Sequence, residues 1–326
     1  MVVASTVSRT TSRPERELVP GQSEKLLREL HLVSRDGKLH ADSLRKLKQV
    51  NHLARLLTPA LDDVLARHPQ AQILDAGAGN AYLGFVLYEL FLREGEATMW
   101  NIEPRADLVA RGEQRAQSLA YARMRFVGET LEQAAANEPA PPAAPSAAVE
   151  PSGVAQTASG ATAPLKDEEP KAKVVLPTRL HLVTALHACD TATDDALLLA
   201  LRRKADHVAL VPCCQAEVAA QLKELAAKNS GPAPFDALWQ HALHRREFGA
   251  HLTNVIRALV LEASGYAVTV TELTGWEHSL KNELILARRV GGEHRGAKEK
   301  LRALLAATGV KPKIARALQL TGPDAA

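Results

Sequence analysis

The sequence predicts an α/β fold built on a mostly parallel, doubly wound sheet, and three observations predict it. From residue 73 onward, apolar runs of strand length alternate with longer segments of helical periodicity. A glycine-rich turn joins the first such strand to its helix. The last two predicted strands, residues 267–273 and 283–288, have no helix between them, which favours an antiparallel hairpin at the sheet edge.

Two segments precede the predicted sheet. Residues 1–22 are rich in Ser, Thr and Arg and are predicted to be disordered, whereas residues 24–32 and 43–57 have helical periodicity. We therefore predict a helical preface over residues 23–58, followed by the main domain over residues 59–292.

The segment from Ile73 to Leu83, ILDAGAGNAYL, reads as a buried strand, a tight turn and the start of a helix. The helix predicted over residues 81–93 has an apolar face made of Leu83, Val86, Leu87, Leu90 and Phe91. Gly77 and Gly79 lack a Cβ, so the turn can bring backbone amides close to a ligand. Amides at the start of a helix favour an anionic or polar group, and we predict a nucleotide-binding turn.

A carboxylate, Glu103, follows the second predicted strand, residues 97–102. It stands 24 residues after Gly79, where it can accept hydrogen bonds from two ribose hydroxyls. The order Asp-x-Gly-x-Gly, which begins at Asp75, resembles the first motif of class I methyltransferases. The resemblance implies S-adenosyl-L-methionine rather than NAD as the cofactor. The residues predicted to bind it are Asp75, Gly77, Gly79, Asn80, Glu103 and His187.

Residues 134–173 interrupt the alternation of strands and helices. They consist largely of Ala, Pro, Ser, Gly, Thr and Glu, with little to bury, so they are predicted to form a flexible insertion. A third strand is predicted before the insertion, at residues 124–127, and a fourth after it, at residues 180–186. The insertion therefore interrupts one domain instead of separating two, which the slow growth of loop-closure entropy allows.

The alternation then resumes. We predict helices over residues 193–204, 216–228 and 252–264, and a strand over residues 207–211. In an open α/β sheet, ligands bind at the carboxyl ends of the strands, so the residues after strands four and five should face the same site as the glycine turn.

His187 and Asp190 follow the fourth strand and are the predicted catalytic pair. Methyl transfer from a sulfonium to a hydroxyl needs alignment of the nucleophile and removal of its proton, which a histidine beside a carboxylate can accept. Two alternatives stay open: His187 packs under the cofactor, and Asp190 caps the helix that begins near Thr193. Asp194 and Asp195 suit the start of that helix, where acids complement the helix dipole.

Four motifs resemble the methyltransferase-domain family that includes methyltransferase-like protein 25 and the glutathione S-transferase C-terminal domain-containing protein. They are DAGAGNAYL, LHACDTATDDAL, VPCCQ and the late EHSLKN. The stretch KLKQVNH at residues 46–52 also resembles the segment before the first motif in bacterial members. The resemblance covers about residues 44–290 without the insertion, and it implies a Rossmann-like class I methyltransferase fold with a seven-stranded sheet.

The motifs after strands four and five are also similar to those of a tRNA ribose methyltransferase family with paired cysteines, which implies RNA as a candidate acceptor. Asp190 stands where that family has glycine, and Gln215 stands where it has histidine. The residues predicted to contact the acceptor are Lys46, Lys48, Cys213, Cys214, Lys281 and Asn282.

The cysteines leave two further hypotheses open. A thiolate of Cys213 or Cys214 could add to a pyrimidine ring, as in RNA cytosine-C5 methyltransferases. A zinc site made of His187, Cys189 and this cysteine pair is disfavoured, because adjacent cysteines lack the C-x₂₋₄-C spacing of tetrahedral sites. We therefore predict no metal, and we expect Trp276 to pack in the core.

The composition is that of a soluble globular protein: the 326 residues are 46% hydrophobic and 24% charged. No apolar run approaches the roughly 20 residues needed to span a bilayer, and three cysteines are too few for a disulfide framework. We therefore expect a cytoplasmic protein, with an organelle transit peptide at the acid-poor start as the alternative.

Positive charge gathers at both ends of the sequence. Residues 1–55 carry 11 Lys/Arg against 6 Asp/Glu, and residues 293–326, a predicted basic helical tail, carry 7 against 3. Such flanks are compatible with RNA, and solvated helix faces are the alternative. The prediction is an S-adenosylmethionine-dependent methyltransferase that acts on RNA, without a membrane or an obligate protein partner. A protein or small-molecule acceptor, or a non-catalytic scaffold, is the alternative.

Overall fold

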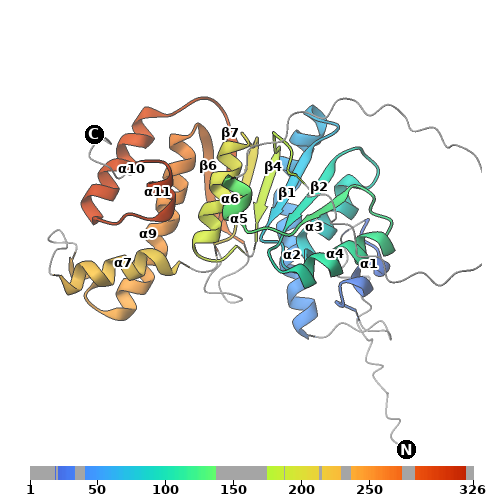
Figure 1. Ribbon diagram of the computed structural model, residues 1–326, viewed down its shortest axis with the longest axis horizontal. Coiled ribbons are helices and arrows are strands. Elements are labelled where there is room, and N and C mark those ends of the chain that lie inside the picture. The colour runs from blue at the N-terminus through green and yellow to red at the C-terminus, as the bar shows by residue number, and fades with distance from the viewer. Residues whose placement is uncertain are drawn as a thin grey trace, which may run out of the picture.

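The computed structural model describes residues 19, 21–33, 41–136, 175–186, 188–212, 215–228, 236–273 and 283–320. The described residues form a seven-stranded sheet in the order β3-β2-β1-β4-β5-β7-β6 (Figure 1). Its strands are β1 (Gln72–Ala76), β2 (Thr98–Ile102), β3 (Met124–Val127), β4 (Leu182–Ala185), β5 (His207–Leu210), β6 (Tyr266–Glu272) and β7 (Glu283–Arg289).

Strands β1 to β5 pair in parallel, and β7 runs antiparallel to both β5 and β6. The predicted mostly parallel sheet with an antiparallel hairpin is therefore confirmed, and so is its seven-stranded form. Within this hairpin, β6 takes the outer position and β7 lies inside it, next to β5.

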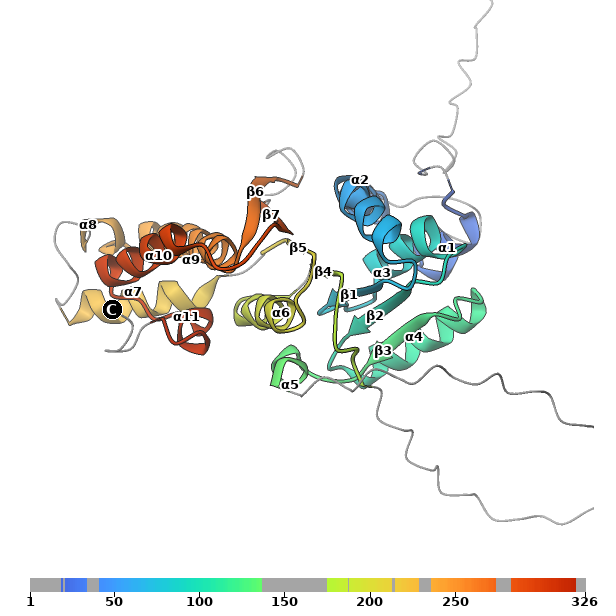
Figure 2. The ribbon, with the colours of Figure 1, turned by 90° about the horizontal axis from the view of Figure 1, so that it is seen from above.

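Helices cover both faces of the sheet. They are α1 (Glu24–Glu29), α2 (Ala41–Arg67), α3 (Tyr82–Leu87), the π-helical turn η2 (Tyr88–Leu92), α4 (Ala106–Ser118), α5 (Leu131–Ala136), α6 (Thr191–Arg202), α7 (Ala216–Ala227), α8 (Asp236–Trp239), α9 (Ala242–Ala263), α10 (Arg295–Thr308) and α11 (Lys313–Ala317). Figure 2 shows α1, α2 and α3 above the sheet, α5 and α6 below it, and α7 to α11 gathered beyond β5.

The strands divide their side chains between two cores. Ile73 and Leu182 pack with the helices α1 to α3, whereas the next residue of each strand, Leu74 and Val183, packs with α6 and α9. This alternation is the two-residue period of a strand that is buried on both faces, which explains why these segments read as continuous apolar runs. Among the described helices, none combines the length and the apolar character needed to cross a bilayer.

The predicted helical preface is part of the main domain. Helix α2 is continuous from Ala41 to Arg67, so the boundary predicted at residue 58 falls inside this helix. Leu47 and Leu57 on this helix are fully buried, and they belong to the same core as Ile73 of β1. The helical periodicity was read correctly, but it continues ten residues further than predicted.

The segment before α2 is held by a buried carboxylate. Glu89, in the π-helical turn, accepts hydrogen bonds from the backbone N–H and the hydroxyl of Ser23, at 2.9 and 2.5 Å, and from the hydroxyl of Tyr121, at 3.0 Å. Ser23 also caps α1. Three donors on one buried carboxylate offset its loss of hydration and fasten α1 to the domain.

The predicted basic tail is also built into the fold as far as the structure describes it. Leu301, Leu305 and Ile314 are buried in the same core as α6 and α9. Residues 1–18 and 137–174, which include most of the predicted disordered start and most of the predicted insertion, lie outside the described residues.

Candidate active site

A cleft of about 610 Å³ opens where the strands β1 to β4 end at their carboxyl termini. Its lining brings together the turn after β1, the segments after β2, β3 and β4, and the first part of α2. Among the described residues it consists of Gly77, Gly79, Asn80 and Tyr82; Glu103, Pro104 and Arg105; Thr130, Leu131 and Glu132; Ala188, Cys189, Ala192 and Asp195; and Lys46, Gln49 and Val50. This lining brings together Gly77, Gly79, Asn80 and Glu103, which were predicted to bind the cofactor, and Lys46, which was predicted to contact the acceptor.

The glycine turn is held in a left-handed conformation, with φ of 70° at Gly77 and 58° at Gly79. A Cβ at Gly77 would lie 3.3 Å from the Cα of Ala188, so the turn after β1 packs directly against the segment after β4. At Gly79, the flexible end of Arg105, at 3.9 Å, is the one contact that a Cβ would make with the described part of the chain. Gly77 therefore allows a close approach of two backbones, whereas Gly79 borders open space in the cleft.

Glu103 is the buried acid of the cleft, with a side chain that is 6% exposed. One carboxylate oxygen, Oε2, accepts a hydrogen bond from the N–H of Gly79 at 2.9 Å. The other, Oε1, accepts from the backbone N–H and the Nε of Arg105, at 3.2 and 2.7 Å. Burial acts to raise the pKa of Glu103, but the hydrogen bonds from Arg105 and Gly79 outweigh it and hold the pKa below its ordinary value.

Asp75 lies beneath the turn. Its residue is 2% exposed, and the hydroxyl of Thr184 on β4 lies 3.2 Å from its Oδ1. Burial raises the pKa of Asp75 to about 7, although hydrogen bonds from Thr184 and from the N–H of Gly84 act in the opposite direction. Asp75 was predicted to bind the cofactor, but the described lining of the cleft does not include it. Its carboxylate supports the turn from below by joining β1, β4 and α3.

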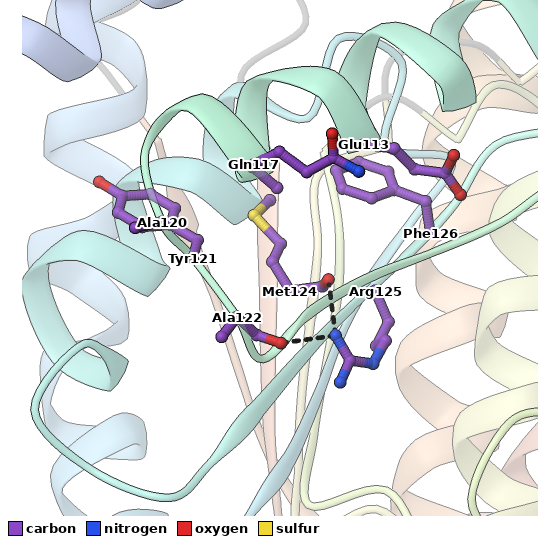
Figure 3. Close-up of a pocket in the computed structure, with 9 residues that line it drawn as sticks. Glu113, Gln117, Ala120, Tyr121, Ala122, Met124, Arg125 and Phe126 are labelled. Atoms are coloured by element: carbon purple, nitrogen blue, oxygen red, sulfur yellow. Dashed lines mark hydrogen bonds between the residues drawn. The ribbon is translucent and has the colours of Figure 1, made fainter. Parts of the chain in front are cut away.

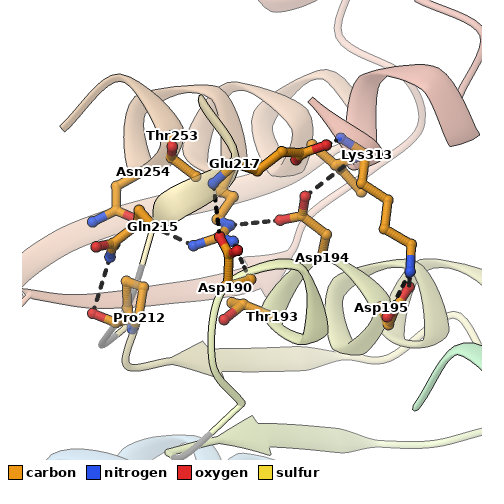
Figure 4. A network of polar contacts seen from close by, with 12 residues as sticks. Asp190, Thr193, Asp194, Asp195, Pro212, Gln215, Glu217, Thr253, Asn254 and Lys313 are labelled. Carbon is orange, nitrogen blue, oxygen red and sulfur yellow. Dashed lines mark hydrogen bonds and ion pairs between the residues drawn. The ribbon is translucent and has the colours of Figure 1, made fainter. Parts of the chain in front are cut away.

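Asp190 holds two segments together at the ends of β4 and β5 (Figure 4). Its Oδ1 accepts hydrogen bonds from the N–H groups of Ala216 and Glu217, at 2.8 and 3.2 Å, and so caps α7. Its backbone has φ 52° and ψ −121°, a conformation that favours glycine. The alternative that Asp190 is a helix cap is therefore the one that this geometry supports, but the helix it caps is α7 and not α6.

A buried ion pair lies behind Asp190. The Nε of Arg257 on α9 is 2.7 Å from Oδ1 of Asp194, and both side chains are 1% exposed. The Nη2 of Arg257 also donates to the backbone oxygen of Asp190, and the N–H of Ile314 donates to Oδ2 of Asp194. Asp194 stands in the first turn of α6, where it was predicted to complement the helix dipole, and its carboxylate also binds residues on α9 and on α11.

The network continues to other cleft segments. Gln215 donates to Asn254 Oδ1 at 3.4 Å, and the Asn254 side chain donates to Glu283 at the start of β7. Lys313 on α11 pairs with Asp195 at 2.8 Å and with Glu132 at 3.2 Å, both in the cleft lining. The residues Arg257, Asn254 and Lys313 were not singled out from the sequence, because no local pattern marks them.

Several predicted site residues lie outside the described residues: His187, Cys213, Cys214, Lys281, Asn282 and Trp276. Cys189 is described, is exposed and lines the cleft. Lys46 lines the cleft as well, whereas Lys48 is exposed on α2 outside the described lining.

A cluster that could offer metal ligands lies at the opposite, amino-terminal edge of the sheet. Ligand atoms of His68, His181 and Asp206 lie within 4.8 Å of one another. However, Nδ1 of His181 accepts the N–H of Gln72 at 2.9 Å, so the neutral ring carries its hydrogen on the other nitrogen. Asp206 already pairs with Arg179 at 2.9 Å. We interpret this cluster as a polar junction between α2, β4 and β5.

A second hollow, of about 590 Å³, lies between α4 and the start of β3 (Figure 3). Glu113, Gln117, Met124 and Arg125 line it. Because Met124 is the first residue of β3, this hollow lies at the amino end of the strand, away from the glycine turn. Its position makes it a poor candidate for a ligand site of an open α/β sheet.

Comparisons with known proteins give the following matches. The fold is similar to that of a putative O-methyltransferase from Klebsiella pneumoniae, with 13% identity over 85% of this chain and 94% of the other, and a TM-score of 0.42. It is also similar to an SAH-bound methyltransferase from Podospora anserina, with 11% identity over 89% and 100% of the two chains and a TM-score of 0.41. A magnesium protoporphyrin IX methyltransferase from Synechocystis, with bound SAH, matches at 13% identity over 82% and 93%, with a TM-score of 0.37. A search of curated protein sequences gave no significant match.

One family profile, described as a methyltransferase domain, matches residues 45–221. The matched region runs from the first part of α2 to α7, and so it contains the glycine turn, Glu103 and both segments that Asp190 joins. It is more than half of the 326 residues. The chain therefore belongs to the methyltransferase-domain family.

Proposed function

We propose that this protein uses S-adenosyl-L-methionine to methylate RNA. The observation that carries the cofactor assignment is the position of Glu103, a buried carboxylate at the carboxyl end of β2 that faces the cleft and accepts the N–H of Gly79. The cleft, at about 610 Å³, is within the range of pockets that hold small molecules and cofactors. These residues fit a nucleoside, because a carboxylate there can accept hydrogen bonds from ribose hydroxyls.

The cofactor supplies a methyl group on a sulfonium. The chain's own residues bind and orient: Glu103 holds the ribose, and the turn at Gly77 and Gly79 lets the rest of the cofactor approach the backbone. Since methyl transfer needs little more than alignment and a place for the acceptor's proton, orientation is the main contribution of this cleft.

For the proton of a hydroxyl acceptor, we assign His187 as the base, on the resemblance to tRNA ribose methyltransferases. Asp190 is assigned a positioning role, because its Oδ1 is already bonded to two N–H groups of α7. By fixing the turn three residues after His187, Asp190 would keep the segment after β4 against the glycine turn.

RNA as the acceptor is supported by the basic first part of the sequence and by that same resemblance. Lys46 lies in the cleft lining, and it belongs to the basic stretch over residues 1–55. In contrast, four basic residues near the C-terminus pair with carboxylates: Arg295, Lys298, Lys313 and Arg316. We therefore expect α2, and not α10 or α11, to face the phosphates.

The test has two stages. Calorimetric titration with S-adenosylhomocysteine should show binding to the wild-type protein and a loss of about 10- to 100-fold in affinity in Glu103→Ala, because two hydrogen bonds to the ribose are lost. The matched control is Glu94→Ala, which removes a carboxylate that is 96% exposed. Equal affinity in Glu103→Ala and the wild type would contradict the cofactor assignment.

The second stage uses radiolabelled S-adenosylmethionine with separate RNA, protein and metabolite fractions. We expect label in RNA, a loss of about two to four powers of ten in turnover in His187→Ala, and weaker RNA binding at high salt. Label in protein or metabolites alone would reject RNA and leave the methyltransferase assignment standing. A covalent adduct with a fluorinated pyrimidine, abolished in Cys213→Ser or Cys214→Ser, would replace ribose methylation by pyrimidine-carbon chemistry.

A further inference from the structure

The acid assigned to the cofactor ribose already has a partner within the chain. Arg105, two residues after Glu103, donates its Nε to Glu103 Oε1 at 2.7 Å. Its Nη2 lies near Gly79, 3.9 Å from the position that a Cβ would take there. The Arg105 side chain therefore folds back across the carboxylate and the glycine turn, on the surface of the cleft that a nucleoside would have to cover.

The number of hydrogen bonds that the Glu103 carboxylate can accept shows that Arg105 and a ribose compete for it. Each carboxylate oxygen accepts about two hydrogen bonds. Oε1 accepts two, from the N–H and the Nε of Arg105, and Oε2 accepts one, from Gly79. One acceptor position therefore remains, whereas a ribose presents two hydroxyls.

The two partners of this ion pair differ in how easily they can move. The Glu103 side chain is 6% exposed and is fixed by backbone donors, while that of Arg105 is 64% exposed. Arg105 is also the N-cap residue of α4, but its side chain makes no capping hydrogen bond. The guanidinium can therefore leave for solvent without disturbing the helix or the core.

We propose that Arg105 is an affinity-setting residue of the cleft, which competes with the cofactor ribose for Glu103 and must release the carboxylate before both hydroxyls can bind. The proposal rests on the assignment of S-adenosylmethionine to this cleft. It predicts that removal of the guanidinium strengthens cofactor binding, which is the opposite of what a residue that contacts the cofactor would do.

The experiment is a calorimetric double-mutant cycle with S-adenosylhomocysteine as the ligand, using the full chain. Arg105→Ala should bind the ligand about three- to fivefold more tightly than the wild type, the range expected for release of a partly exposed ion pair. The difference should shrink as NaCl is raised, because salt screens the pair in the wild type. Arg111→Ala removes an exposed arginine that pairs with Asp107 on α4, and it should leave the affinity unchanged.

The second half of the cycle identifies the partner. In a Glu103→Gln background, Arg105→Ala should give no gain, since the carboxylate for which both groups compete is absent. An equal gain in both backgrounds, or weaker binding in Arg105→Ala alone, would overturn the proposal. Absence of binding to the wild-type protein would instead reject the cofactor assignment itself, so the two failures are distinguishable.

Discussion

The two halves of the cleft are built in different ways. On the β1–β2 side, the site consists of a turn and one acid that are close in sequence, and Glu103 is bonded to Gly79, 24 positions earlier. On the β4–β5 side, the segments are held by partners far along the chain: Arg257 is 63 positions from Asp194, and Ile314 is 120 positions from it. The first half presents backbone and a carboxylate to a ligand, while the second encloses its charges.

This difference in construction suits the two sides of the cleft to different roles. One short motif determines the shape of the β1–β2 side. This side is therefore suited to a ligand that proteins with the same motif have in common. The β4–β5 side depends on helices α9 and α11, which lie beyond the family match at residues 45–221. The wall that we assign to the acceptor is thus shaped in part by helices outside the matched region.

Loss of the buried ion pair should give the largest effect and tests whether the β4–β5 side depends on it. Arg257→Met leaves the Asp194 carboxylate buried without its partner, and we expect the free energy of unfolding to fall by about 3–5 kcal/mol. Denaturant unfolding measures this change. Arg295→Met is the control, because Arg295 and its partner Glu299 are largely exposed, and it should change stability by less than about 1 kcal/mol.

A second variant distinguishes the loss of the ion pair from a general disruption of core packing. Combining Arg257→Met with Asp194→Leu removes both charges and should recover much of the lost stability. If the single variant were as stable as the wild type, the network would not be what holds the β4–β5 side.

On the other side of the cleft, Asp75 gives a prediction on pH. Its pKa is raised to about 7 in the folded protein, so the folded state keeps a proton that the unfolded state has lost. The stabilising contribution is fully present below about pH 4 and is lost as the pH rises through 7. Relative to Asp75→Asn, which does not titrate, the wild type should lose about 2–4 kcal/mol over this interval. A constant difference between the two proteins across pH would mean that Asp75 is ionised in the fold.

The two glycines of the turn test the contact between the β1–β2 side and the β4–β5 side of the cleft. Gly77→Ala places a methyl group 3.3 Å from the Ala188 backbone in a left-handed conformation, so we expect a loss of about 2 kcal/mol. Gly79→Ala has the same backbone strain but open space, and should lose about 1 kcal/mol. Thermal unfolding of both variants checks the order, and a reversed order would mean that the contact with Ala188 is not tight.

Asp190 should also give a small change in stability, to which its helix cap and its backbone strain contribute in opposite directions. Asp190→Ala loses the cap on α7 and keeps the unfavourable backbone conformation, and it should be less stable by about 1–2 kcal/mol. Asp190→Gly loses the same cap but relieves the strain, so its stability should stay closer to that of the wild type. Equal losses in the two variants would show that the positive φ of Asp190 carries no strain.

The sequence allowed the sheet and the β1–β2 side of the site to be predicted, because both depend on local patterns. The strand at residues 124–127 was predicted with its observed bounds, and Glu103 and the glycine turn do line one cleft. Helices α4, α5 and α8 were not predicted, and α2 is longer than its periodicity suggested.

The rest of the site depends on contacts that periodicity does not encode. Asp190 was predicted to be a catalytic residue, with a cap for the next helix as the alternative, but the partners of its carboxylate are on α7, 26 positions away. Arg105 is two residues after Glu103 in the sequence, but nothing in the sequence pattern predicts the hydrogen bond between their side chains. The structure shows that the Arg105 side chain turns back onto the Glu103 carboxylate. A buried pair such as Asp194 and Arg257 forms where two distant elements happen to pack, so it has no signature in either segment.

Helix α2 extends from the carboxyl ends of the strands to their amino ends. Lys46 lines the cleft near its start, and near its end Asp63 bonds to His207 at 2.6 Å, at the first residue of β5. One residue more or fewer between them would rotate one end by about 100° and shift it by about 1.5 Å relative to the other. Both ends could not then reach their partners. Substitutions along α2 leave the distance between its two ends unchanged, whereas an insertion or a deletion changes it. We therefore expect relatives that share both contacts to align across α2 without gaps.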